Sequence, residues 1–109
     1  MVKIWVDDIR PKPCKCGIHF RSVNSVIGWL SAKVEEQKSE EILLDLDHDA
    51  GDYRSDGGDY IKILDFLERE DFMKKFPFLK ISFRIHSMNP VGKENMRKII
   101  RKNGWKEVE

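Results

Sequence analysis

Residues 41–51 have the sequence Glu-Ile-Leu-Leu-Asp-Leu-Asp-His-Asp-Ala-Gly, and this stretch does most to decide the fold. Its apolar run at residues 42–44 is typical of a central strand that is covered on both faces. The run ends in the polar residues 47–49 and passes into a loop at residues 49–59 that is rich in Gly and Asp. The stretch therefore predicts a buried strand of a parallel sheet with an acidic carboxyl end.

Two other segments have the same design. Residues 2–6 alternate apolar and polar side chains before the acidic pair at residues 7–8, and residues 81–85 do so before His86-Ser87. Apolar residues at helical spacing separate these strands. The full predicted order is strand 2–6, loop 9–17, strand 18–21, helix 23–36, strand 41–46, loop 49–59, a helix that starts at Tyr60 and finishes before Phe76, strand 81–85, a helix from Pro90 that Gly104 caps, and strand 105–108.

This alternation of strands and helices predicts a mostly parallel five-stranded sheet with right-handed crossovers and helices on its faces, which is a three-layer α/β sandwich. The loop at residues 9–17 holds Pro11 and Pro13, which neither continue a strand nor fit inside a helix. A chain of 109 residues has room for one such domain, residues 1–109.

The charge balance narrows the function. Lys and Arg number 20 and Asp and Glu 19, so the net charge of +1 argues against the broad basic surface that non-specific nucleic-acid binding uses. No apolar run approaches the roughly 18 residues that span a bilayer, and the first residues lack a basic segment followed by an apolar one. We therefore expect a cytoplasmic protein with no membrane partner.

Cys14 and Cys16 are the only cysteines, and a spacing of one intervening residue is unfavourable for a disulfide. With His19 they offer three zinc ligands, whereas a structural zinc site needs four. We expect two free thiols on a loop, with zinc as the alternative.

Three polar clusters end three different predicted strands. Ligands of open parallel sheets bind beyond the carboxyl ends of the strands, so these clusters are expected to form one site. Asp7 and Asp8 are adjacent carboxylates that suit a divalent metal ion, Mg²⁺ or Mn²⁺, and Asp47 would complete that metal site. The alternative for the pair at residues 7–8 is capping of a loop.

Two histidines are candidates for proton transfer. His48 and His86 each follow a strand and titrate near neutral pH, so one is expected to accept a proton from water and the other to protonate a leaving oxygen. Catalysis would also use Asp47. A structural role is the alternative for either ring.

Phosphate binding is expected from the remaining polar residues at these strand ends. Arg10 has the planar fork that matches phosphate oxygens, although it is also placed to pair with Asp7 and Asp8. Asn89 followed by a proline is a helix start, where free amides favour an anion. The substrate-binding set that we predict is Arg10, Asp49, Ser87, Asn89 and Asn95, with Asn95 equally able to face solvent.

Three motifs carry a resemblance to a known family: Asp-Asp-Ile-Arg-Pro-Lys-Pro at residues 7–13, Asp-His-Asp-Ala-Gly at residues 47–51, and His-Ser-Met-Asn-Pro-Val-Gly-Lys-Glu-Asn-Met at residues 86–96. Together they resemble the cyclic-phosphate processing receiver-like family. The resemblance implies a receiver-like, flavodoxin-like fold in which the Pro-rich loop replaces the first helix. The functional positions that it implies are Asp7, Asp8, Arg10, Asp47, His48, Asp49, His86, Ser87, Asn89 and Asn95.

The chain departs from that family pattern at two positions. Ala50 stands where Leu is usual, which loosens packing, and Asp45 stands where Ser is expected. Asp45 would add a metal ligand or simply enlarge the negative field. The last strand offers only Lys106, near its start, where a phosphotransfer receiver carries lysine at the end. Phosphotransfer is therefore disfavoured.

The function that we predict is a metal-assisted phosphoesterase, a hydrolase that acts on the cyclic phosphate of a nucleotide or of an RNA 2′,3′-cyclic end. The alternatives are a module that binds a cyclic nucleotide without turnover, and a degenerate receiver used for protein interaction. The nucleotide base, the metal and the oligomeric state are left open by the sequence.

Overall fold

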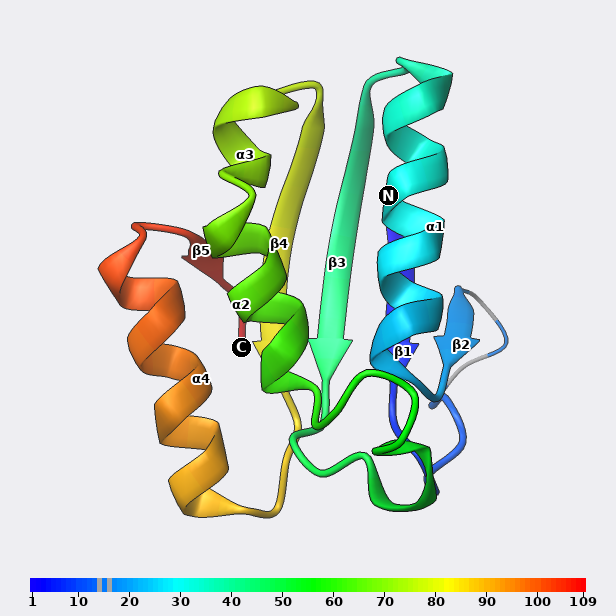
Figure 1. Ribbon diagram of the computed structural model, residues 1–109, viewed down its shortest axis with the longest axis vertical. Coiled ribbons are helices and arrows are strands. Elements are labelled where there is room, and N and C mark those ends of the chain that lie inside the picture. Colours follow the sequence, from blue (N-terminus) through cyan, green and yellow to red (C-terminus); the bar gives the residue numbers. More distant parts are fainter. Residues whose placement is uncertain (14, 16) are drawn as a thin grey trace.

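The computed structural model describes residues 1–13, 15 and 17–109. Five parallel strands form one sheet in the order β2-β1-β3-β4-β5 (Figure 1). The predicted receiver-like α/β fold with a parallel five-stranded sheet is confirmed. The strands are β1 Val2–Val6, β2 Ile18–Phe20, β3 Glu40–Leu46, β4 Leu79–Ile85 and β5 Lys106–Glu107, and the helices are α1 Val23–Glu36, α2 Ile61–Arg69, α3 Phe72–Lys75 and α4 Pro90–Lys102, with a short 3₁₀ turn at Gly51–Tyr53.

The helices begin where their capping residues predict. Ser22 accepts a hydrogen bond from the backbone N–H of Ser25 at the start of α1, and Asn89 accepts one from Gly92 at the start of α4. The segment predicted as one helix after Tyr60 is divided in two. Asp71 separates α2 from α3 because its backbone is left-handed, with φ of 52°, which no continuous helix allows.

Strand register separates the two faces of the sheet. One face carries the side chains of the hydrophobic core, among them Ile4, Leu44 and Phe83, which are neighbours across β1, β3 and β4 and are fully buried. The residue that follows each of them points to the other face, because side chains alternate along a strand. Trp5, Asp45 and Arg84 therefore form a row across that second face.

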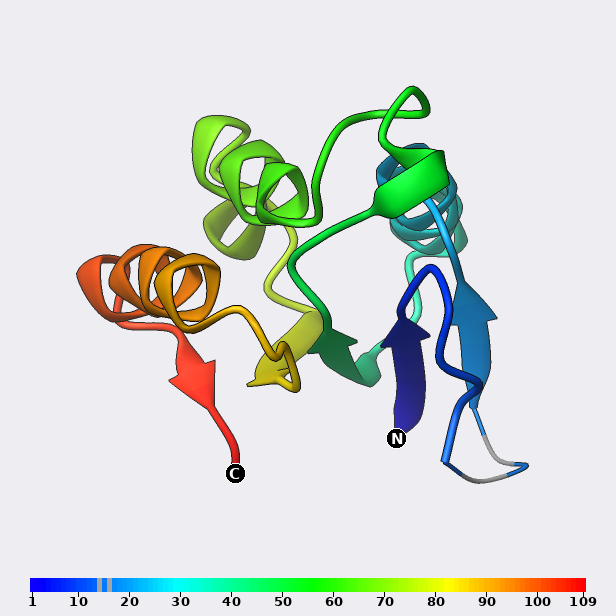
Figure 2. The ribbon, with the colours of Figure 1, turned by 90° about the horizontal axis from the view of Figure 1, so that it is seen from below.

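All four helices cover the same face of the sheet, as the view along the strands shows (Figure 2). Strand order gives the reason. The helical connections from β2 to β3, β3 to β4 and β4 to β5 run in one direction across the sheet, and right-handed crossovers in one direction lie on one face. A three-layer sandwich was predicted, with helices on both faces. Among the described residues no helix lies on the second face, so this part of the prediction is wrong.

Only the connection from β1 to β2 runs the opposite way, and it is the Pro-rich loop. Trp5 Nε1 donates a hydrogen bond of 2.9 Å to the carbonyl of Arg10, so this loop is tied to the second face. Lys12 and Pro13 there enclose a small cavity of about 90 Å³ together with Trp5 and other residues of the face. The loop therefore stands where the first helix would otherwise pack.

The predicted cysteine pair, Cys14 and Cys16, lies outside the described residues, so the zinc alternative is not addressed by the structure. Within residues 1–13, 15 and 17–109, no helix combines the length and the apolar character that crossing a bilayer requires.

Candidate functional site

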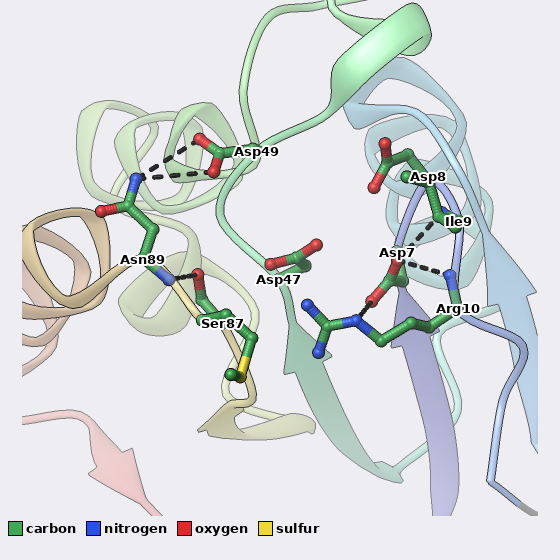
Figure 3. Close-up of a pocket in the computed structure, with 9 residues that line it drawn as sticks. Asp7, Asp8, Ile9, Arg10, Asp47, Asp49, Ser87 and Asn89 are labelled. Atoms are coloured by element: carbon green, nitrogen blue, oxygen red, sulfur yellow. Dashed lines mark hydrogen bonds and ion pairs between the residues drawn. The ribbon is translucent and has the colours of Figure 1, made fainter.

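A cleft of about 340 Å³ opens at the carboxyl ends of β1, β3 and β4. This edge includes the point between β1 and β3 where the direction of the strand order reverses, which is where doubly wound sheets bind ligands. Three separate loops supply its walls, and Figure 3 shows their side chains converging. The lining residues are Asp7, Asp8, Ile9, Arg10, Asp47, Asp49, Ser87, Met88 and Asn89.

Asp7 is the most enclosed carboxylate of the cleft and is fully buried. Its Oδ1 accepts hydrogen bonds from the backbone N–H groups of Ile9 at 2.9 Å and Arg10 at 2.8 Å. Its Oδ2 lies 2.9 Å from His86 Nε2. Burial alone would raise the pKa of Asp7, but these hydrogen bonds and the histidine outweigh it and hold the pKa below its usual value. Asp7 is therefore ionised and fixed in place.

Asp8 and Asp47 add negative charge beside Asp7. Burial raises the pKa of Asp8, and the charges of Asp7 and Asp47 raise it further. Asp47 is nearly buried, and its Oδ1 accepts a 2.8 Å hydrogen bond from the N–H of His48. Gly51 has φ of +54°, and a Cβ at this position would overlap the Asp8 carboxylate. Glycine suits this position because another residue would be strained at this φ and would displace the Asp8 carboxylate.

These three carboxylates fit a divalent cation. Burial and then the charges of Asp7 and Asp47 raise the pKa of Asp8, and a bound cation would offset both effects. Carboxylate oxygens are the ligands that Mg²⁺ and Mn²⁺ prefer. Atoms of Asp7, Asp47 and His86 all lie within 4.8 Å of one another, which is close enough to share one ion.

The cleft also holds hydrogen-bond donors. The side chain of Arg10 extends toward the middle of the cleft (Figure 3), with its Nε 3.7 Å from Asp7 Oδ2. Ser87 Oγ accepts a 3.0 Å hydrogen bond from the N–H of Asn89, which tightens the turn into α4. The Nδ2 group of Asn89 lies at 3.5 Å from both oxygens of Asp49, so this amide is only loosely held.

His48 lies behind Asp49. Its Nδ1 is 2.8 Å from Asp49 Oδ1, and its side chain is 15% exposed whereas that of Asp49 is 53% exposed. The ring packs against Gly92 in the first turn of α4, where a Cβ would overlap it. Asp49 therefore faces the cleft, and His48 reaches it through Asp49.

His86 lies beneath the cleft and is not among its lining residues. Its Nε2 faces Asp7 at 2.9 Å and its Nδ1 faces Asp45 Oδ1 at 2.8 Å. The ring stacks on Trp5 with centroids 3.7 Å apart and planes inclined by 6°. Both nitrogens are thus engaged, and in this arrangement neither is free to meet a leaving oxygen.

Seven of the predicted site residues line one cleft: Asp7, Asp8, Arg10, Asp47, Asp49, Ser87 and Asn89. His48 and His86 contact members of this set from outside it. Asn95 is exposed on α4 and is not part of the lining. Its predicted role in substrate binding stays a prediction.

Sequence reasoning missed the residues that support the site. Asp59 accepts a 2.9 Å hydrogen bond from the N–H of Ala50, and the N–H of Tyr60 donates to the carbonyl of His48 at 2.9 Å. These two contacts close the loop that follows β3. Gly92 belongs to the motif at residues 86–96, but the sequence did not indicate its contact with the distant ring of His48.

The fold and the site define a receiver-like domain with an acidic cleft at the switch in strand order. In agreement, residues 2–102 match the cyclic-phosphate processing receiver domain. The chain belongs to that family. Comparison with curated proteins found no match, and neither did comparison with solved structures.

Proposed function

We propose that this protein is a metal-assisted phosphodiesterase that opens a cyclic phosphate of a nucleotide or an RNA end. The observation that carries the proposal is the cleft itself, in which the carboxylates of Asp7, Asp8 and Asp47 and the guanidinium beside them meet two polar side chains at a helix start. Cyclic-phosphate processing is also what the family's description states. Mg²⁺ and Mn²⁺ are the candidate ions.

Substrate placement follows from charge. The carboxylates of Asp7, Asp8 and Asp47 would hold the cation, and the guanidinium of Arg10, which lies beside Asp7 and extends toward the middle of the cleft, donates to a phosphate oxygen. Ser87 and Asn89 donate to the remaining oxygens. When bound, a divalent ion polarises the phosphoryl group and offsets the charge that develops on its oxygens.

Proton transfer is assigned to the Asp49–His48 pair. Asp49 is the exposed member, and the nearby imidazole of His48 holds its carboxylate in one direction. The pair accepts a proton from the attacking water and returns it to the ring oxygen that leaves phosphorus. One P–O bond to water forms, one P–O bond of the ring breaks, and the product is a phosphomonoester with a free hydroxyl.

The rim of the cleft suits a nucleoside. Ile9 and Met88 flank the opening, and both are 81% exposed although they are large apolar side chains. Exposed apolar groups beside a polar pocket are typical of a ligand contact. We propose that they pack against the base or ribose of the substrate.

The test is a mass-spectrometric screen of 2′,3′-cyclic mononucleotides, cyclic dinucleotides and RNA with a 2′,3′-cyclic end, with Mg²⁺ or Mn²⁺ present. The proposal predicts conversion of at least one substrate to a monoester, and loss of that conversion in Asp47→Asn. Binding of a substrate without product would favour the alternative of a binding module. Neither binding nor turnover across the panel would overturn the proposed function.

A further inference from the structure

His86 and Asp45 are two titratable side chains next to the cleft that the proposed reaction leaves unused. Asp45 lies near the carboxyl end of β3, on the face opposite the described helices, and is only 8% exposed. A charged residue at such a place needs a partner, because burying an unpaired charge is costly. Its oxygens have two: His86 Nδ1 at 2.8 Å and Arg84 at 3.7 Å.

Contacts at Nδ1 and at one face of the ring fix the orientation of the imidazole. Asp45 fixes Nδ1, the indole of Trp5 stacks on the ring face, and Trp5 is itself tied by its hydrogen bond to Arg10. The other ring nitrogen that can bind a ligand is Nε2. It points at the acidic end of the cleft, 2.9 Å from Asp7 Oδ2.

This geometry is that of a metal-binding histidine. An ionised carboxylate only accepts hydrogen bonds, so the contacts with Asp45 and Asp7 place a hydrogen on Nδ1 and another on Nε2 in the metal-free protein. A divalent ion bound between Nε2 and Asp7 would replace the hydrogen on Nε2, because a histidine must lose a proton to bind a metal. Metal-bound histidines usually donate their second ring N–H to a carboxylate or carbonyl in this way. Neighbouring ligands of an octahedral ion with bonds of about 2.1 Å lie about 3.0 Å apart, which matches the 2.9 Å between Nε2 and Asp7.

We propose that His86 Nε2 is a direct ligand of the divalent ion together with Asp7 and Asp47, and that Asp45 is the positioning residue that aims this ring. The inference rests on the metal site of the proposed function. It makes the centre a mixed nitrogen and oxygen site, which favours a first-row transition ion over Mg²⁺, since imidazole is a poor ligand for Mg²⁺.

The same contacts allow one competing arrangement. In that arrangement the ring keeps hydrogens on both nitrogens when the ion binds, donates to Asp7 as well as to Asp45, and is not a ligand of the metal. Only a measurement of the bond between nitrogen and metal separates the two arrangements.

Pulsed electron paramagnetic resonance of the Mn²⁺-loaded protein makes that measurement. The proposal predicts modulation from a coordinated imidazole nitrogen in the wild type, its loss in His86→Gln, and its retention in His48→Gln. Mn²⁺ bound without nitrogen modulation would overturn the inference, as would failure to bind Mn²⁺ at millimolar concentration.

Ion affinities test the part played by Asp45. Removing a carboxylate behind a metal-bound histidine typically weakens affinity 10- to 100-fold, so Asp45→Ala is expected to weaken Mn²⁺ binding about tenfold or more and Mg²⁺ binding much less. Arg84→Gln is the matched control, because it removes a neighbour of Asp45 and leaves the Asp45–His86 contact; its Mn²⁺ affinity should stay within about twofold. Equal losses for both ions in Asp45→Ala would contradict the positioning role. Thermal unfolding of each variant in metal-free buffer shows whether the variant is folded.

The spectroscopic result and the hydrolysis screen can fail separately. Turnover without nitrogen modulation would overturn only this inference. Nitrogen modulation without turnover of any substrate would overturn only the proposed hydrolysis.

Discussion

At the scale of single residues, the site depends as much on missing side chains as on charged ones. Gly92 leaves the space that the ring of His48 occupies, and Gly51 leaves the space of the Asp8 carboxylate. Each glycine joins the cleft to an element that is distant in sequence. Substitutions at these positions therefore test the geometry of the site without removing any of its polar groups.

Gly92→Ala is expected to destabilise the protein, although alanine is the better helix former. The added methyl group overlaps the His48 ring, and such overpacking costs about 1 to 3 kcal/mol, more than the roughly 1 kcal/mol that alanine contributes to a helix interior. Urea unfolding measures the difference. Gly28→Ala in α1 is the control, because a Cβ there meets nothing within 4 Å; it should stabilise the fold, and an equal gain at Gly92 would contradict the described packing.

Asp8→Asn is expected to stabilise the metal-free protein at neutral pH. Burial and the charges of Asp7 and Asp47 raise the pKa of Asp8 in the folded state, so the folded state gains stability by protonating Asp8 and loses it as the pH rises through that raised pKa. The asparagine variant has no such loss. Its advantage, of about 1 kcal/mol or less, should appear near pH 7 and vanish near pH 3 in chemical unfolding. An advantage that is independent of pH would contradict this origin.

At the scale of elements, strand ends and helix starts carried most of the predictable information. The strand ends at Asp7 and Asp47 and the helix start at Asn89 were recognisable because their residue types follow local rules of capping and alternation. The direction of the two imidazole rings was not, since Asp45 meets His86 across two neighbouring strands and His48 meets a helix more than forty residues later.

Two helix caps of similar chemistry separate folding from binding. Asn89→Ala and Ser22→Ala each remove a side chain that accepts a hydrogen bond in the first turn of a helix, so each is expected to cost about 1 kcal/mol in thermal or urea unfolding. Asn89 also lines the cleft, whereas Ser22 does not. Calorimetry should therefore show weaker binding of a cyclic nucleotide to Asn89→Ala alone. Equal binding by both variants would remove Asn89 from the substrate site.

At the scale of the whole molecule, strand order determines where the chemistry and the helices lie. Reversal of the strand order beside β1 places the acidic loops at one edge, and the right-handed crossovers place every helix on one face (Figure 2). The sheet and its order of elements were predictable from hydrophobic pattern. That a loop and none of the described helices lies against the second face follows only from the strand order, in which the connection from β1 to β2 runs the opposite way.

The central claim is that this cleft opens a cyclic phosphate with the Asp49–His48 pair moving the proton. ³¹P nuclear magnetic resonance of a 2′,3′-cyclic mononucleotide or cyclic RNA end identified by the screen tests it most directly, with wild type and His48→Ala compared in Mn²⁺. The account predicts that the cyclic signal is replaced by a monoester signal with the wild type, and that His48→Ala binds the substrate but slows this replacement by about 100-fold. Unchanged turnover in His48→Ala, or a cyclic signal that persists with the metal-loaded wild type, would contradict it.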